Sequence, residues 1–257
     1  MSFIRLTAVA AALLLSGTAS RPASPPLRIA AAADLRFALD DLVKAFRQSH
    51  PGVEVEPTYG SSGNFYSQLL NQAPFDLFLS ADVSYPHNLA KQGLIVPESE
   101  FNYAIGRIVL WTARASGIDV ERLKMDALRQ PSVRHIAIAN PQHAPYGVAA
   151  EAALHKLGVY DAVKDKLVMG ENISQAFQLV QSGAAEVGIV ALSLTLGPTV
   201  SGQGSYWEIP LDSYPRIQQG GAILKWTHNL DAAQAFRAFL LAPEGRAILK
   251  RYGFSGE

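Results

Sequence analysis

Apolar runs typical of β-strands alternate with segments of helical periodicity in the first part of the chain. The strand-like runs span residues 27–33, 53–59 and 75–80, and the helical segments span residues 36–49, 65–71 and 85–92. Repeated strand–helix–strand order of this kind favours a parallel sheet with helices packed on its faces.

A second α/β series follows, between strand-like runs at residues 107–112 and 222–226. Within it we expect strands at residues 136–139, 167–169 and 187–190, and helices at residues 149–157 and 174–182. The last two helical segments, residues 230–240 and 243–252, have no partner sheet nearby in the sequence. We therefore expect them to return to the first series.

This order predicts an α/β protein of two lobes with a ligand cleft between them. We assign residues 27–106 plus 215–257 to lobe 1 and residues 107–214 to lobe 2. The chain then crosses between the lobes twice.

The N-terminal segment has the features of an export signal. Arg5 precedes an apolar run at residues 6–15, and Thr18-Ala19-Ser20 offers small residues for cleavage. We predict a signal peptide at residues 1–20 and a tether at residues 21–26. A membrane anchor is the alternative, but the apolar run is too short to span a bilayer comfortably. We expect a soluble, exported, periplasmic protein.

Composition narrows the classes of function. The formal net charge is +0, which gives no support for nucleic-acid binding, since that normally needs a clustered basic face. The chain has no cysteine, which excludes disulfides, thiol catalysis and cysteine–metal sites. An apolar fraction of 49% is ample for sizeable cores.

Four short segments have the character of helix starts after a strand-like stretch: residues 31–35, 60–64, 140–147 and 170–175. The first N–H groups of a helix have no partner inside it, and the helix dipole places positive charge there. Several such ends that meet in a cleft can bind an anion without lysine or arginine.

Each segment also has an ordinary structural interpretation. Ser61 or Asp34 could simply cap a helix, and a proline such as Pro145 is common at a helix start. Asp76, Asp82, His87 and Lys91 invite a metal or catalytic interpretation, but the chain has no recognisable metal-ligand spacing, and we favour a structural role for Asp76 in its buried strand. We expect no free metal cation and no cofactor.

At these residues the chain resembles the periplasmic molybdate-binding proteins of ABC importers. The resemblance extends over essentially the whole mature chain, and its most specific string is Ala-Pro-Phe-Asp-Leu-Phe-Leu-Ser-Ala-Asp at residues 73–82. Further matching pieces lie at residues 31–35, 60–63, 145–147, 188–190 and 250–254. The resemblance implies the type II periplasmic-binding fold, molybdate or tungstate held between the lobes, and delivery to an ABC-type membrane permease by a monomeric receptor that is not an enzyme.

The resemblance also implies roles for individual residues. Ser62 is expected to donate to the oxyanion through its hydroxyl and backbone N–H, and Tyr146 and Ile173 through backbone N–H groups. Two positions depart from the family pattern: Asp34 stands where the family has serine, and Ala191 stands where it has tyrosine. We also assign weaker contributions to Ser61, Gly63, Asn172 and Ala191.

Asp34 leaves more than one oxyanion as a candidate ligand. An ionised carboxylate about 4 Å from the anion would repel it by about 4 kcal/mol at an effective dielectric constant of about 20. Asp34 therefore points away, is protonated, ligates the metal centre directly, or faces a protonatable oxyanion such as phosphate or arsenate. A more distant alternative is a secreted hydrolase that uses Ser62, His143 and Asp34, although the chain lacks a nucleophile-elbow motif.

Overall fold

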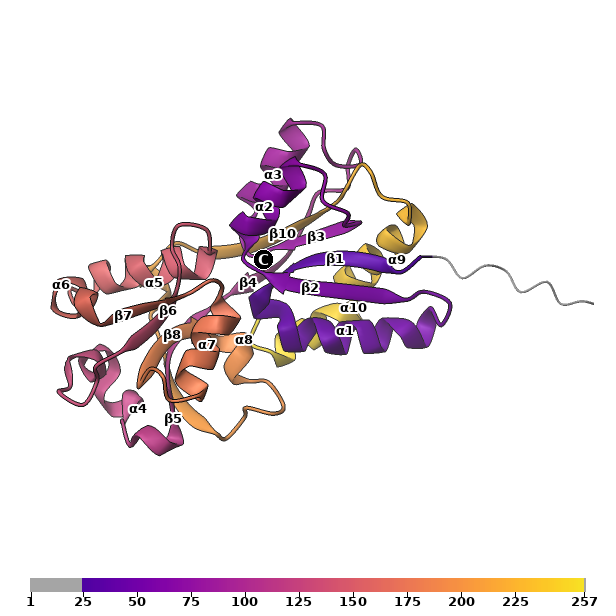
Figure 1. Ribbon diagram of the computed structural model, residues 1–257. Helices are drawn as coiled ribbons and strands as arrows, with labels where there is room; N and C mark the ends of the chain where they lie inside the picture. Colours follow the sequence, from indigo (N-terminus) through magenta and orange to yellow (C-terminus); the bar gives the residue numbers. More distant parts are fainter. Residues whose placement is uncertain (1–24, 257) are drawn as a thin grey trace, which may run out of the picture.

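The computed structural model describes residues 25–256. The predicted signal peptide, residues 1–20, and residues 21–24 of the predicted tether lie outside the described residues. The strands form two five-stranded sheets, each covered by helices, so that the molecule has two lobes (Figure 1).

The first lobe is built on the sheet order β2-β1-β3-β10-β4. Its strands are β1 (Leu27–Ala32), β2 (Val55–Gly60), β3 (Leu77–Ser80), β4 (Phe101–Gly106) and β10 (Ile217–Ile223). Strand β1 pairs parallel with β2 and β3, whereas β10 runs antiparallel between β3 and β4. Its helices are α1 (Arg36–Ser49), α2 (Ser62–Leu70), α3 (Ser84–Lys91), α9 (Leu230–Leu241) and α10 (Pro243–Arg251).

The second lobe is built on the sheet order β7-β6-β8-β5-β9. Its strands are β5 (Ile108–Ala113), β6 (Ile136–Ala139), β7 (Leu167–Gly170), β8 (Val187–Ala191) and β9 (Gly204–Glu208). Its helices are α4 (Val120–Leu123), α5 (Pro145–Lys156), α6 (Tyr160–Val163), α7 (Ile173–Gln181) and α8 (Leu192–Thr195). Short 3-10 helices are η1 (Ala33–Leu35), η2 (Arg114–Ser116), η3 (Lys124–Arg129), η4 (Lys164–Lys166) and η5 (Leu211–Ser213).

The C-terminal helices complete the core of the first lobe. Figure 1 shows α9 and α10 beside α1, at one face of the first sheet. The Phe46 ring of α1 meets the Phe236 ring of α9 edge to face, with centroids 5.1 Å apart. The Tyr252 hydroxyl, just after α10, donates to Asp41 Oδ2 at 2.8 Å. Residues from the two ends of the described chain therefore share one core.

One predicted strand is misplaced. The pattern placed a strand at residues 222–226, but β10 spans Ile217–Ile223, and Leu224 makes an isolated bridge with Ile95. The glycines at residues 220 and 221 have low strand propensity, and the polar glutamines at 218 and 219 interrupt the apolar pattern, which conceals the strand in the sequence. Strands β4 and β9 were not predicted.

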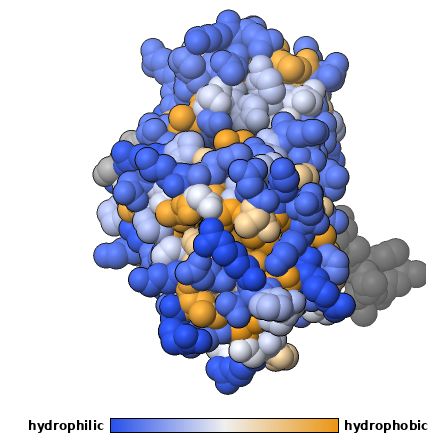
Figure 2. Space-filling view, turned by 90° about the vertical axis from the view of Figure 1, so that its left-hand side faces the viewer, coloured by the Kyte–Doolittle hydropathy of each residue, from blue (hydrophilic) through white to orange (hydrophobic). Residues whose placement is uncertain are grey.

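One face of the molecule carries exposed apolar side chains on the second lobe. Figure 2 shows apolar atoms at the surface in the lower part of the view, where the second lobe lies, and a mostly hydrophilic upper part. Large exposed apolar side chains in the second lobe are Val148, Met169 and Leu211. Single side chains of this kind are common on protein surfaces. Within residues 25–256 no helix is both long enough and apolar enough to cross a membrane.

The Phe46–Phe236 contact predicts that α9 is essential to the first lobe. Phe236 is fully buried, so Phe236→Ala should lower the free energy of unfolding by about 3–5 kcal/mol in denaturant titrations. Leu211→Ala, at a position 57% exposed, is the matched control and should change it by less than about 0.5 kcal/mol. Equal effects of the two substitutions would contradict this packing.

Candidate functional site

A small cavity lies where the two lobes meet. Asp34 and Ser62 line it from the first lobe, and Tyr146 and Ile173 line it from the second. The other lining residues are Ala32, Ala33, Gly60, Ser61, Ala81, Ala144 and Pro145. Its volume is about 10 Å³, which is room for about one water molecule. A tetrahedral oxyanion is larger than this space.

Three helices begin at this cavity, and their caps leave N–H groups for it. Ser61 caps α2 by accepting from Asn64 N at 3.3 Å, and Asn172 caps α7 by accepting from Gln175 N at 3.0 Å. These bonds use the third N–H of each helix. The first N–H groups, on Ser62 and Ile173, have no partner inside their own helices.

Helix α5 adds a third start from the second lobe. Pro145 is its first residue, and the N–H of the following Tyr146 also has no intrahelical partner. The three helix dipoles place partial positive charge at the cavity. The arrangement can therefore bind an anion through backbone donors, although none of the described residues that line the cavity is Lys, Arg or His.

Ser62 offers a further donor. Its side chain is buried, and its Oγ accepts a hydrogen bond from Ala81 N at 2.9 Å. Because Oγ acts as the acceptor in that bond, its own proton remains available for a ligand. The hydroxyl and the N–H of Ser62 thus belong to one lining residue.

Asp34 is held by groups from both lobes. Its Oδ2 accepts from the Tyr146 hydroxyl at 2.8 Å and from Gln219 Nε2 at 2.5 Å. Its backbone carbonyl accepts from Ser193 Oγ at 2.7 Å. The N-cap of α1 is Leu35, so the interpretation of Asp34 as an ordinary helix cap is wrong.

The environment of Asp34 favours its neutral form. Burial raises the pKa of its carboxyl to about 6, against an ordinary value of 3.8, although the bonds from Gln219 and Tyr146 lower it. None of the ion pairs among residues 25–256 includes Asp34. Burial, together with the negative charge of Asp34, raises the pKa of Tyr146 well above its usual value, so this hydroxyl remains a donor.

His143 links the lobes beside the cavity. Its backbone carbonyl accepts from Gly63 N at 3.0 Å, and its Nδ1 lies 3.0 Å from Ser61 Oγ. Its Nε2 lies 3.5 Å from Glu171 Oε2. A Cβ on Gly63 would lie 2.6 Å from the His143 carbonyl oxygen, so only glycine permits this approach.

The sequence-predicted residues are brought together in part. Asp34, Ser61, Ser62, Tyr146 and Ile173 all line the cavity. Three weaker candidates lie outside the described lining. Gly63 contacts His143, Asn172 caps α7, and Ala191 ends β8 opposite Ile108. Sequence reasoning missed Gln219, because an isolated glutamine in an unrecognised strand gives no signal.

The geometry also bears on two other interpretations of the sequence, the hydrolase site and the role of Asp76. His143 contacts Ser61, and Asp34 contacts Tyr146 and Gln219, so Ser62, His143 and Asp34 form no Ser–His–Asp arrangement among the described residues. The carboxyl of Asp76 accepts from Arg28 N at 2.8 Å and from Thr227 Oγ1 at 2.6 Å, which confirms its structural role. Within residues 25–256 no group of three or more His, Cys, Asp or Glu residues could hold a metal ion.

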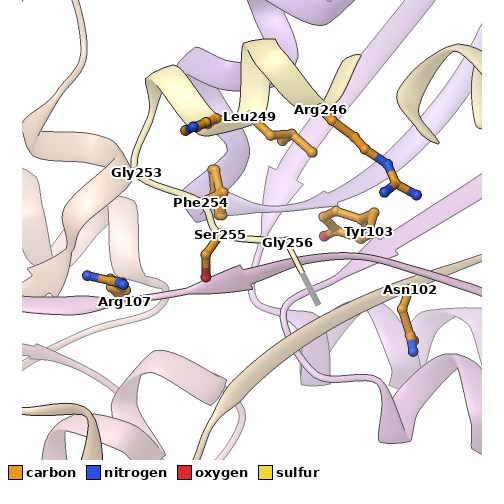
Figure 3. A pocket seen from close by; sticks show the side chains of 10 residues that line it. Asn102, Tyr103, Arg107, Arg246, Leu249, Gly253, Phe254, Ser255 and Gly256 are labelled. Carbon is orange, nitrogen blue, oxygen red and sulfur yellow. The ribbon is translucent and has the colours of Figure 1, made fainter. Parts of the chain in front are cut away.

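A larger cavity, of about 530 Å³, lies by the C-terminal segment. Figure 3 shows Arg107, Tyr103 and Arg246 around residues 253–256. Its described lining includes none of the helix starts of α2, α5 or α7. The small cavity, not the large one, therefore brings the starts of these three helices together.

Comparisons with known proteins agree with this architecture. A family model described as bacterial extracellular solute-binding protein matches residues 27–255. Molybdate-binding protein ModA of Rhodobacter capsulatus is 38% identical over 254 residues, 99% of this chain and 97% of that protein. ModA of Azotobacter vinelandii is 40% identical over 228 residues, 89% of each. The solved structure of the Azotobacter vinelandii periplasmic molybdate-binding protein has a TM-score of 0.83 and 36% identity, and the match covers 90% of this chain and 99% of that one.

Two α/β lobes that close over a small polar cavity define the class of two-lobed periplasmic binding proteins, which confirms the predicted fold class. The chain belongs to the bacterial extracellular solute-binding protein family. Proteins of this family are receptors for solutes, not enzymes.

The buried carboxyl of Asp34 should make the stability of the ligand-free protein depend on pH. Its native pKa of about 6 exceeds the ordinary 3.8, so between these values the native state binds more protons than the unfolded chain. The free energy of unfolding then falls as pH rises through this window, by up to about 3 kcal/mol. Asp34→Asn stays neutral, so its melting temperature should rise relative to the wild type between about pH 4 and about pH 7. A constant offset between the two melting curves would contradict this assignment.

Proposed function

We propose that this protein is an extracytoplasmic receptor that captures molybdate or tungstate between its lobes and delivers it to an ABC-type permease. The observation that carries the proposal is the meeting of three helix starts, from both lobes, at one small cavity. Backbone donors and dipoles suit a small, multiply charged anion. The similarity to proteins named as molybdate-binding supports the choice of oxyanion.

The lining of the cavity supports the contacts that the family resemblance implies. Ser62 donates through its hydroxyl and N–H, and Tyr146 and Ile173 donate through N–H groups. Asp34 is the fourth oxyanion-binding residue. Ser61, Gly63, Asn172 and Ala191 act indirectly, by capping helices or shaping the closed lobes.

A different oxyanion is the second candidate, and Asp34 is the reason for it. A carboxylate accepts a proton from hydrogen phosphate or hydrogen arsenate, whereas the serine of the family pattern donates one. The buried carboxyl in the cavity lining favours a ligand that shares a proton with the protein. Phosphate and arsenate are therefore the rival ligands.

The remaining parts of the proposal concern the whole protein. We propose that residues 1–20 direct export and are removed, that residues 21–26 form a tether, and that the mature receptor is a soluble periplasmic monomer without a resident cofactor. The lobe boundaries proposed at 106/107 and 214/215 fit the positions of β4, β5, η5 and β10.

A panel of anions tests the ligand. Molybdate or tungstate at about 100 times its dissociation constant should stabilise the protein by about 2.7 kcal/mol, measured as a shift in melting temperature. Sulfate at the same concentration should stabilise it less. A clear shift with phosphate or arsenate, without one for molybdate or tungstate, would move the assignment to the rival ligands.

Gly63→Ala supplies a matched control, because Gly63 lies outside the cavity lining but at the contact between the lobes. An added Cβ would meet the His143 carbonyl oxygen and hold the lobes apart. The variant should fold like the wild type yet show a reduced shift with molybdate. A full shift in Gly63→Ala would mean that capture does not need this approach of the lobes.

A further inference from the structure

One carboxyl oxygen of Asp34, a residue that lines the cavity, is unusual in its hydrogen bonding. Asp34 is 1% exposed, and its Oδ1 finds no hydrogen-bond partner among residues 25–256. The other oxygen, Oδ2, accepts from both Tyr146 and Gln219. Buried polar atoms are nearly always hydrogen-bonded, so an unpartnered oxygen on a residue that lines a cavity indicates a missing partner, which a ligand can supply.

The charge of Asp34 conflicts with an anion in the same cavity. No Lys, Arg or His is among the described lining residues. Two negative charges at short range in a buried site repel each other strongly, and a like charge disfavours the ionised carboxyl. A protonated carboxyl removes the repulsion and converts an acceptor into a donor.

We propose that Asp34 binds the oxyanion as a neutral carboxylic acid that donates its Oδ1–H to an anion oxygen, so that capture by the ionised protein takes up one proton from solution. This inference rests on the proposed function. The proton belongs on Oδ1 because Oδ2 already accepts two hydrogen bonds. The step joins one carboxylate, one proton and the anion, and no other bond forms or breaks.

Neighbouring elements offer few rivals for the proton. Helices α7 and α8 carry no titratable side chain, and β10 contributes the neutral Gln219. Helix α5 contributes Tyr146 and strand β4 contributes Tyr103. Burial and the charge of Asp34 raise the pKa of both tyrosines well above the usual value, so both remain neutral.

Strand β2 and helix α1 also adjoin the 3-10 helix η1 that contains Asp34, and His143 lies in a nearby loop. Tyr59 of β2 donates to Asp40 of α1, and Arg36 of α1 is exposed. His143, in contact with Ser61 and Glu171, is the nearby imidazole whose contribution the experiment must separate from that of Asp34.

The linkage between protonation of Asp34 and binding of the anion determines how the affinity should depend on pH. Burial raises the pKa of Asp34 to about 6 in the ligand-free protein, so the carboxyl is ionised at about pH 8. If it is neutral in the complex, the affinity should fall about tenfold for each pH unit above that pKa and level off below it. Molybdate remains a dianion above neutral pH and supplies no proton of its own.

Calorimetric titration of the full-length mature protein with molybdate tests the proposal. Titrations between about pH 7 and about pH 9, in buffers of different ionisation enthalpy, give the number of protons taken up. The wild type should take up close to one proton per molybdate. Asp34→Asn, which is neutral and places an N–H where the acid places its O–H, should take up none and should bind with pH-independent affinity. His143→Asn should still take up close to one proton per molybdate.

The outcomes separate this inference from the proposed function. Molybdate binding by the wild type with no proton uptake and flat affinity overturns the inference and leaves the receptor proposal intact. Uptake that persists in Asp34→Asn and disappears in His143→Asn assigns the proton to His143 and also overturns it. A wild type that binds no molybdate at any pH overturns the proposed function, and this inference with it.

Discussion

Backbone N–H groups at the start of a helix have no acceptor inside the helix, and three helices start at the cavity between the lobes. Ser62 and Ile173 open their helices, and Tyr146 follows the first residue of α5. Their donors come from the backbone, so side-chain identity matters little at Ile173. The caps at Ser61 and Asn172 set where each helix begins and therefore which residues supply its free N–H groups.

Hydrogen bonds between the two lobes also lie beside this cavity. Asp34 of the first lobe accepts from Tyr146 of the second, and Gln219 also donates to the Tyr146 hydroxyl at 3.2 Å. Gly106, which ends β4 just before the chain enters the second lobe, leaves room for that hydroxyl: a Cβ there would lie 2.1 Å from it. The crossing between the lobes and the polar network of Asp34 are thus in direct contact. A change in the charge of Asp34 acts on both ligand and closure.

The sequence predicts local features of the site better than its long-range partners. Apolar runs and helix-start residues locate the ends of strands and helices, and the family resemblance then selected Ser62, Tyr146 and Ile173 within those segments. The partners of Asp34 are 112 and 185 residues away, and no pattern in the sequence joins them. Gln219 was hidden further because its strand contains poor strand formers. The binding roles of the lining residues, and that of Ala191 outside the lining, stay predictions.

The return of the last helices to the first lobe has a consequence for how the chain folds. The first core needs contacts between residues such as Asp41 and Tyr252, which are 211 positions apart. The second lobe, in contrast, is formed by one continuous stretch of chain. Long-range closure slows folding, because the entropy of a large loop must be lost before the contacts form. The first lobe therefore remains incomplete until the C-terminal helices arrive, and the unfinished sheet with the apolar face of α1 is the surface that a chaperone would have to protect.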